Sequence, residues 1–271
     1  FFHIDSLPMP EGHVVSDESE YVYDMDIYWC KECGMVQTQL DLNLDDYYKE
    51  YVYTTGSSKY VEEYMQNFAQ ELCKEYFLTK DSLVVEVGSG DGAQLEKFRK
   101  LGCKVIGIEP SIILASEAEK KHIPTIVSMF NADTVCKLTQ DYGNVDAIII
   151  QYTVDHLQQP AEFIRDVSNL LSKNGVLAIE VHDFEKIYER NEACLFTHEH
   201  SIYPTFNSIG SLMQLHGMKI IGTDVVSESK RRGNSIVIVA AKLANKNKKI
   251  EESLTPISQQ LKQESAYNEF G

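Results

Sequence analysis

Three ionisable side chains, His198, Glu199 and His200, lie in a row between apolar neighbours in the segment 196–203, FTHEHSIY. Such a run is compatible with a metal site, a catalytic base with its support, or a polar loop whose histidines are solvated. Two histidines two positions apart, with no third ligand nearby in the sequence, make a poor metal site. A histidine that titrates near neutrality suits the removal of a weakly acidic proton.

A second candidate site is the glycine-rich stretch VVEVGSGDG at 84–92, where a strand bends into a helix. Gly88 permits a tight turn, and Gly90 lets a ligand approach the backbone near the free N–H groups of the helix. Glu109 follows 21 residues after Gly88, where a carboxylate can bind a ribose diol. The spacing E-x-G-x-G-x-G indicates adenosine with an amino-acid tail rather than a pyrophosphate. An ordinary strand–helix loop is the alternative.

The cysteines suggest a third site. Only two of the six, Cys30 and Cys33 in CKECG, are close in sequence. They are typical of half of a four-cysteine zinc site, and an accidental pair is the alternative. The spacing of the others shows no disulfide framework, which indicates a reducing compartment.

The elements that position these residues alternate between strands and helices. After an amphipathic helix over 57–77, strands are predicted at 83–87, 104–109, 124–127, 145–150 and 175–181, and helices at about 92–101, 111–121, 160–172 and 205–216. This alternation predicts a parallel sheet covered on both faces. Residues 218–226 and 234–241 read as an antiparallel hairpin at its edge. Residues 1–56 are expected to form a small irregular lobe, 57–244 the main domain, and 245–271 a helical tail.

The composition narrows the function. Lys and Arg number 25 against 41 Asp and Glu, a net charge of −16, which disfavours binding to nucleic acid or to an anionic membrane surface. No apolar run approaches the ~20 residues of a membrane helix and no signal peptide is visible, so the protein is predicted to be cytoplasmic. The chain begins with Phe rather than Met, so we expect a trimmed N-terminus.

Seven stretches in order resemble class I S-adenosylmethionine (SAM) methyltransferases, and one branch in particular, the zinc-containing C-methyltransferases of nucleotide-linked 4-keto-deoxysugars. They are CKECGMVQ (30–37), YVYTTGSS (51–58), VVEVGSGDGAQL (84–95), GIEPS (107–111), HLQQPAEFI (156–164), LLSKNGVLAIEV (170–181) and THEHSIY (197–203). The resemblance implies an α/β fold with a seven-stranded, Rossmann-like sheet that ends in an antiparallel hairpin. It also implies SAM as cofactor and zinc at the cysteine pair.

The resemblance also implies roles for single residues. His200 would be the base, and Glu199 would bind and orient the sugar. Tyr53 of YVY, preferred over Tyr51, would place a phenol near the transferred methyl group, with aromatic packing as the alternative. His156, which follows the fourth strand, would help to shape the pocket; a helix-capping or packing role is the alternative. SAM would contact Gly88, Ser89, Gly90, Asp91, Glu109 (ribose), Pro110, Met129 and Phe130 (adenine), and Gln151.

The chain departs from the family pattern in three places. Thr197 stands where the family has Tyr, and RRGNS (231–235) replaces a Gly-Gly-Ser turn. Its added positive charge would meet substrate phosphate or be solvated. In the family a first Cys pair lies before a segment similar to IDSLPMP (4–10), and QESAYNEFG (263–271) resembles the start of a further C-terminal domain. We therefore expect a fragment or a short member.

The predicted function is SAM-dependent methyl transfer to a carbon of a small nucleotide-sugar substrate. A base removes the proton beside a ketone, and the resulting enolate attacks the sulfonium methyl group in line. Two alternatives stay open. One is a SAM-dependent O-methyltransferase of a sugar or a phosphorylated metabolite, which Thr197 and the altered RRGNS loop motivate. The other is a non-catalytic SAM-binding scaffold.

Overall fold

Alternating strands and helices dominate the computed structural model, which describes residues 2–8, 22–39, 48–49, 51–52, 54, 58–231 and 233–244. Tyr53 and the tail 245–271 lie outside the described residues, so the predictions made for them stay predictions. Within the described part, every strand and helix predicted from residue 57 to 241 is present, with ends that differ by a few residues. The sequence prediction of an α/β fold is confirmed.

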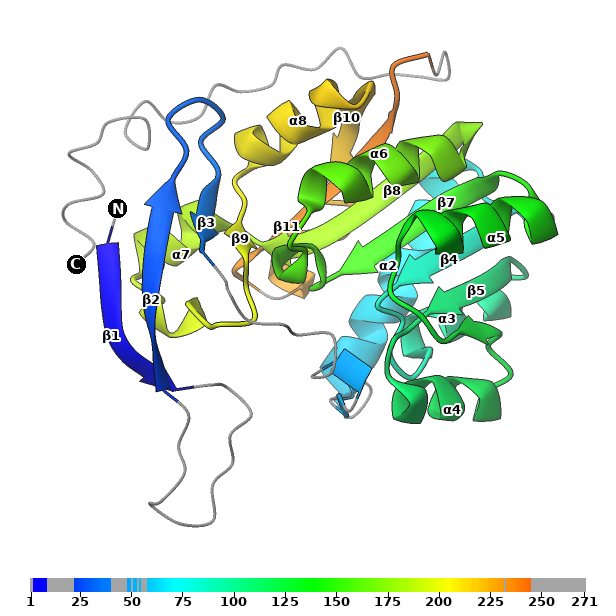
Figure 1. Ribbon diagram of the computed structural model, residues 1–271. Coiled ribbons are helices and arrows are strands. Elements are labelled where there is room, and N and C mark those ends of the chain that lie inside the picture. Colours follow the sequence, from blue (N-terminus) through cyan, green and yellow to red (C-terminus); the bar gives the residue numbers. More distant parts are fainter. Residues whose placement is uncertain are drawn as a thin grey trace.

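The main sheet has seven strands in the order β10-β11-β8-β7-β4-β5-β6 (Figure 1). Five are parallel, and β10 and β11 run antiparallel to their neighbours. The strands are β4 (Leu83–Val87), β5 (Lys104–Ile108), β6 (Thr125–Ile126), β7 (Val145–Gln151), β8 (Leu171–His182), β10 (Met218–Thr223) and β11 (Ser235–Lys242). From β4 the chain proceeds to β5 and β6 on one side and then to β7 and β8 on the other. Ligands bind open α/β sheets at such a reversal, outside the carboxyl ends of the strands.

Helices cover both faces of this sheet, as the continuous apolar strands require. In β4, Val84 packs into the core beneath α2, α3 and α4, whereas Val85 packs into the core beneath α5, α6 and α8. In β7, Ile149 packs on the same face as Val84, and Ile148 packs on the same face as Val85. Each such buried side chain contributes roughly 1.5–3 kcal/mol. The helices are α2 (Lys59–Tyr76), α3 (Ala93–Lys100), α4 (Ile112–Lys120), α5 (Ala132–Tyr142), α6 (Pro160–Leu170) and α8 (Phe206–Leu215).

Two helices were not predicted from the sequence, α5 and the short α7 (Phe184–Arg190). The apolar signal in α5 is weak, since only Thr134 and Leu138 are buried along its eleven residues. Helix α7 has seven residues, too few to show a periodic pattern clearly.

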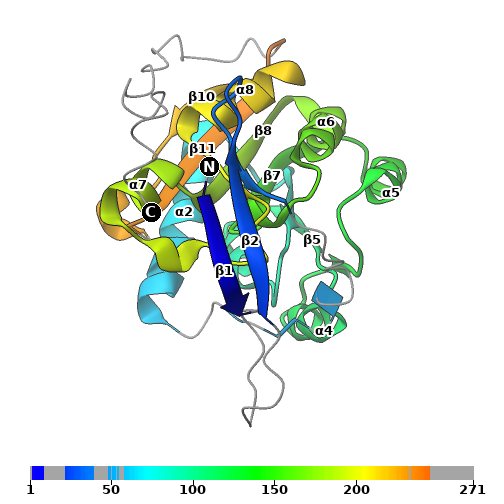
Figure 2. The same cartoon turned by 60° about the vertical axis from the view of Figure 1, so that its left-hand side comes forward.

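The N-terminal lobe, expected to be irregular, instead contains an antiparallel sheet in the order β1-β2-β3-β9 (Figures 1 and 2). Its strands are β1 (Phe2–Pro8), β2 (Val22–Trp29), β3 (Val36–Thr38) and β9 (Ile202–Tyr203). In β2, Met25 and Ile27 are buried while their neighbours are exposed, which is the period of two of a half-buried strand. They pack with Phe184, Phe196 and Tyr203 in a separate small core. The lobe is therefore built around the segment that carries His198, Glu199 and His200.

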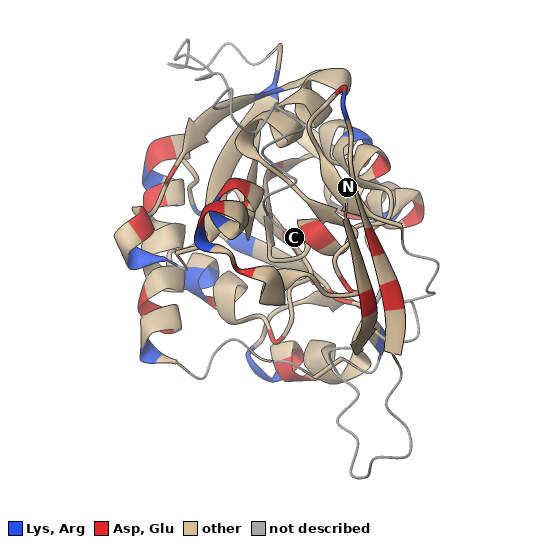
Figure 3. Cartoon of the chain, turned by 90° about the vertical axis from the view of Figure 1, so that its left-hand side faces the viewer, with Lys and Arg blue, Asp and Glu red and all other residues tan. Residues whose placement is uncertain are grey.

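Acidic residues are spaced along the neighbouring strands β1 and β2 (Figure 3). Asp5, Asp24 and Asp26 are among them, and Asp26 Oδ1 lies 2.7 Å from Nδ1 of His3. This face would repel a polyanion, in agreement with the net charge. Among the described helices, none has the length and apolar character needed to cross a bilayer.

Candidate active site

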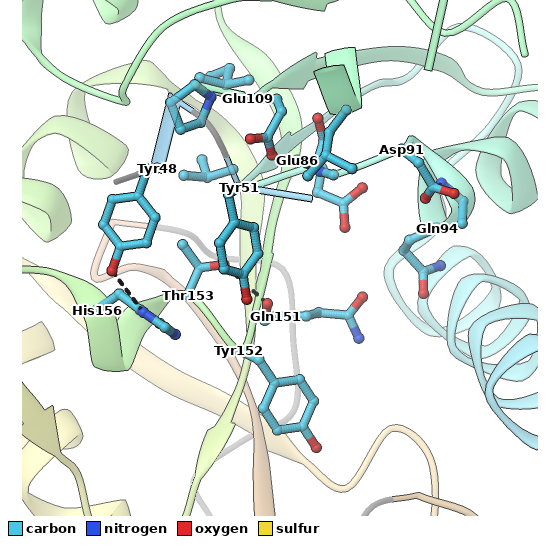
Figure 4. A pocket seen from close by; sticks show the side chains of 18 of the residues that line it. Tyr48, Tyr51, Glu86, Asp91, Gln94, Glu109, Gln151, Tyr152, Thr153 and His156 are labelled. Carbon is cyan, nitrogen blue, oxygen red and sulfur yellow. Dashed lines mark hydrogen bonds between the residues drawn. The ribbon is translucent and has the colours of Figure 1, made fainter. Parts of the chain in front are cut away.

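A cavity of about 390 Å³ opens at the carboxyl ends of β4, β5, β7 and β8. Its wall combines the glycine-rich turn after β4, residues of α2, the short helix η1 (Val154–His156), and Glu199 and His200. Figure 4 shows Glu86 and Glu109 on one side of this cavity and Tyr48 and His156 on another. All nine predicted SAM contacts line it: Gly88, Ser89, Gly90, Asp91, Glu109, Pro110, Met129, Phe130 and Gln151.

Gly88 and Gly90 have different tasks in the turn. Both have positive φ angles, +68° and +53°. A Cβ atom on Gly88 would come within 2.6 Å of Thr153 Oγ1, so glycine is needed there for packing between strand ends. A Cβ on Gly90 would meet nothing within 4 Å. Gly90 therefore leaves open space in which a ligand can approach the backbone.

Glu109 is hydrogen-bonded to the glycine-rich turn that it faces. Its Oε2 accepts from the backbone N–H of Gly90 at 2.8 Å, and its Oε1 accepts from that of Ser111 at 2.8 Å. Burial raises the pKa of the Glu109 carboxyl, and the two backbone donors act in the opposite direction. Each oxygen retains a second lone pair, so the carboxylate can still accept hydroxyl groups of a ribose.

The cofactor end of the cavity is acidic. Burial, followed by the charges of Asp91 and Glu109, raises the pKa of Glu86 well above its ordinary value. Asp91 pairs with Lys121 at 2.6 Å. None of the described residues that line the cavity is Lys or Arg. A wall of this kind suits a ligand that carries positive charge, such as an ammonium or a sulfonium.

A carboxylate that was not predicted as a site residue, Glu180 at the end of β8, organises the cavity floor. It is fully buried and accepts from Tyr64 (2.7 Å), Gln151 (2.8 Å), Tyr152 (2.9 Å) and Ser235 (3.1 Å). Because four donors satisfy it, the charge can stay buried at modest cost. Gln151, predicted to contact SAM, uses its amide N–H in this network.

The three residues of HEH do not act together. His198 points away from the cavity, and its Nε2 donates to the carbonyl oxygen of Leu7 in β1 at 2.9 Å. Glu199 and His200 line the cavity. Nδ1 of His200 lies 3.1 Å from the carbonyl oxygen of Leu195. A carbonyl only accepts, so Nδ1 carries the proton and Nε2 of the neutral ring keeps its lone pair.

The neutral state of His200 follows from its surroundings. Burial is the main cause that lowers the pKa of His200 to about 4. The neighbouring imidazoles of His156 and His182 act in the same direction as burial, and Asp155 acts against them. At neutral pH the ring is therefore unprotonated and able to accept a proton.

Asp155 lies at the centre of these imidazoles. Its Oδ2 is 2.7 Å from Nδ1 of His182 and 3.6 Å from Nε2 of His200, and its Oδ1 is 3.8 Å from Nε2 of His156. Burial alone would raise the pKa of Asp155, but the three imidazoles hold it well below its usual range. The N–H of His182 donates to Oδ2 and stabilises the carboxylate in its buried position. Nitrogen or oxygen atoms of Asp155, His156 and His200 lie within 4.8 Å of one another, near enough to hold a metal ion. The fold thus supplies the neighbours that HEH lacks in the sequence.

Tyr48, also missed in the sequence, reaches the same place. Its hydroxyl is 2.9 Å from Nδ1 of His156, and burial followed by the charges of Glu199 and Asp155 raises its pKa (Figure 4). Tyr51 lines the cavity beside it. His156 thus shapes the pocket, as one of its two sequence readings proposed.

The RRGNS loop was expected to present its positive charge either to substrate phosphate or to solvent, and both expectations are wrong for Arg231. Its side chain is 5% exposed, pairs with Asp224 and donates to the carbonyl oxygen of Val226. The connection between β10 and β11 folds this guanidinium inward, so it is neither solvated nor available to a phosphate. Arg232 lies outside the described residues.

Cys30 and Cys33 lie in the turn between β2 and β3. The backbone N–H groups of Cys33 and Glu32 lower the pKa of Cys30, whereas burial raises that of Cys33. A turn that stabilises a thiolate fits two ligands of a tetrahedral zinc ion. In the described ranges no third His, Cys or carboxylate joins them, so these two residues would hold only half of such a site.

A family model described as a methyltransferase domain matches residues 60–223. C-methyltransferase NovU of Streptomyces niveus is 28% identical over 238 residues, 86% of this chain and 56% of NovU. Ubiquinone biosynthesis O-methyltransferase of Rhodopseudomonas palustris is 26% identical over 103 residues, 35% of this chain and 38% of that protein. The chain spans about half the length of the curated relatives it matches.

Solved structures with the same fold include the SAH-bound magnesium protoporphyrin IX methyltransferase of Synechocystis. Its TM-score is 0.53 at 16% identity, and the match covers 73% of this chain and 98% of that one. A SAM-dependent methyltransferase of Clostridium acetobutylicum has a TM-score of 0.52 at 12% identity, and the match covers 69% of this chain and 93% of that one. The chain therefore belongs to the methyltransferase-domain family and has the Rossmann-like fold of SAM-dependent methyltransferases.

Proposed function

We propose that the protein transfers a methyl group from SAM to the carbon beside the ketone of a nucleotide-linked keto-deoxysugar. The observation that carries this proposal is that one cavity is lined both by the glycine-rich turn and by His200, a neutral imidazole with a bare Nε2. The similarity to a C-methyltransferase over 86% of the chain supports it.

The chemistry assigns each group a task. Nε2 of His200 removes the proton from the carbon beside the ketone, and Glu199 binds and orients the sugar. SAM supplies an electrophilic methyl group on a sulfonium. The enolate carbon forms a bond to that methyl carbon, the bond from methyl to sulfur breaks, and its electrons return to sulfur. The proton is left on His200.

The cofactor is proposed to lie across the ends of β4, β5 and β7. The acidic wall favours its ammonium and sulfonium groups, and Glu109 accepts from its ribose. Phe130, fixed edge-on against Phe163 at 5.2 Å, would lie beside the adenine. The contacts proposed are Gly88, Ser89, Gly90 and Asp91 to the methionine part, and Pro110, Met129 and Phe130 to the adenine.

The acceptor would enter the cavity by its sugar. A diphosphate has no Lys or Arg to bind among the described lining residues, whereas Tyr48 and Tyr51 offer aromatic faces to a sugar ring. The nucleotide part would therefore lie beyond the described cavity wall.

The proposal is tested by incubating the full chain with SAM and a panel of nucleotide-linked keto-deoxysugars. Mass spectrometry should find a methylated product, and NMR should place the methyl group on the carbon beside the ketone. In D2O with S-adenosylhomocysteine in place of SAM, the hydrogen at that carbon should exchange. Methylation at oxygen without exchange would identify an O-methyltransferase, and SAM binding without any turnover would favour a scaffold.

A further inference from the structure

Asp155 lies buried beside His156 and His200, which line the acceptor end of the cavity. It is 0% exposed, and its Oδ1 has no hydrogen-bond partner among the described residues. Burying a carboxylate with an unused oxygen is costly unless a positive charge compensates it. His200, whose ring is neutral in the resting site, does not provide that charge.

The carboxylate is held in a fixed position relative to the HEH segment. His182, the last residue of β8, donates from Nδ1 to Asp155 Oδ2 at 2.7 Å. Ser201, which follows His200, donates from its backbone N–H (2.7 Å) and its hydroxyl (3.1 Å) to the backbone carbonyl of Asp155. Movement of one segment relative to the other would break these bonds.

His200 would need a compensating charge once it accepts a proton. Its Nε2, the only ring nitrogen free to do so, lies 3.6 Å from Asp155 Oδ2. The other groups that face this ring are His156, His182 and Tyr203, with ring centroids 4.9, 5.3 and 5.6 Å away. Two imidazoles and a phenol do not stabilise a neighbouring cation as a carboxylate does. Among the described residues, Asp155 supplies the one carboxylate recorded within 4 Å of the bare nitrogen.

We propose that Asp155 is a positioning residue for proton abstraction. His182 holds the Asp155 carboxylate in place, and the carboxylate stabilises the imidazolium of His200 in the transition state. The inference rests on the proposed function, because it needs His200 to act as the base. In the resting site the carboxylate faces a lone pair, and proton transfer converts this repulsion into an ion pair. The contact is therefore stronger in the transition state than in the ground state, which is the condition for faster chemistry.

The principal test is Asp155→Asn in the full chain, with Asp166→Asn as the matched control. Asp166 is also a buried carboxylate, but it lies on α6 outside the cavity and contacts Arg165. The probe is a thymidine diphosphate-linked 4-keto-6-deoxyglucose in D2O with S-adenosylhomocysteine. Asp155→Asn should slow exchange by about 10²–10³-fold, within the usual contribution of a positioned base, while Asp166→Asn stays within about two-fold.

Two further readouts separate positioning from damage to the fold. Asp155→Asn should bind S-adenosylhomocysteine with unchanged affinity. With SAM, the deuterium isotope effect on methyl transfer to the α-deuterated probe should rise, because proton abstraction becomes rate-limiting. Exchange at the wild-type rate would overturn the inference, and so would a loss explained by weaker cofactor binding. No exchange in the wild type would instead count against the proposed function.

A measurement without acceptor tests the inference even if the wild-type protein shows no exchange. Nitrogen-15 NMR of the histidine rings should show His200 neutral at pH 7 with its proton on Nδ1, and titrating at lower pH in Asp155→Asn than in the wild type. A proton on Nε2, or an unchanged titration, would refute it. Exchange activity should also survive chelation. A loss of activity that zinc restores also in the Cys30→Ser variant, which lacks the other candidate zinc site, would make Asp155 a metal ligand and overturn the inference.

Discussion

His200→Asn and His198→Asn form a matched pair of substitutions on one short segment. Each wild-type ring makes one hydrogen bond to a backbone carbonyl, His200 to Leu195 at 3.1 Å and His198 to Leu7 at 2.9 Å. Both are almost fully buried. Loss of either bond should cost about 0.5–1.5 kcal/mol, so thermal or urea unfolding should show similar, modest destabilisation in the two variants.

The two variants should differ in catalysis. Only His200 lines the cavity, so its loss should lower kcat by roughly 10²–10⁴-fold, or about 3–5 kcal/mol in the activation free energy, and leave the Kd for SAM unchanged. His198→Asn should change kcat by only about two-fold. The assays are mass-spectrometric turnover with the keto-sugar substrate, calorimetry with SAM, and exchange in D2O. Equal, modest losses in both variants would refute the assignment of the base and favour a structural loop.

Four further predictions concern the cofactor, the pH dependence and the metal. Gly90→Ala should weaken SAM binding at least ~10-fold in calorimetry, because the new methyl group fills space that the ligand needs, and it should destabilise the fold by ~1 kcal/mol. Gly217→Ala is the control, since Gly217 also has a positive φ and nothing within 4 Å of an added Cβ. This variant should be destabilised by the same amount but bind SAM normally. Glu109→Gln should weaken SAM binding about 10-fold, and unchanged affinity would remove this residue from the site. Burial is the main cause that lowers the pKa of His200 to about 4, below its ordinary 6.5, so the folded protein keeps this base neutral as the pH falls. The rate of exchange should therefore stay constant from pH 7 to about pH 5. A pH–rate profile with a midpoint near 6.5 would contradict this. Cobalt(II) added to the chain should give a thiolate absorption band that Cys30→Ser or Cys33→Ser abolishes, and a band that persists would place the metal elsewhere.

The main sheet was predictable because its strands carry strong local signals. LVVEV and VDAIII are continuous apolar runs, as strands covered on both faces must be, and the glycines of VGSGDG mark where the first one ends. The residues at the carboxyl ends of these strands could be placed at one crevice by topology alone, and Gly88, Glu109 and Gln151 do line one cavity.

The acceptor end was less predictable because its contacts join distant segments. The alternation in YDMDIYW at 23–29 is a local signal for β2, which pairs with β1 and β3. The link from this sheet to the HEH segment depends on the pairing of β3 with β9, which is only two residues long. The contact between Asp155 and His182 spans 27 positions and depends on the register of β7 and β8. Arg231 appeared exposed because a charged turn usually is, and its burial depends on Asp224 across the hairpin.

The pairing of β3 with β9 has a consequence for the way the chain is made. Thr38 donates from its hydroxyl to the carbonyl of His200 at 2.8 Å, across a separation of 162 residues. At about 5–20 residues per second, β3 leaves the ribosome roughly 8–30 s before its partner is synthesised. During that time its edge is unpaired and prone to pair with other chains. The residues at the ends of β4, β5 and β7, by contrast, need only contacts from the middle of the chain. We therefore expect the nascent protein to assemble its cofactor end first and to acquire its acceptor end only once residue 203 has emerged.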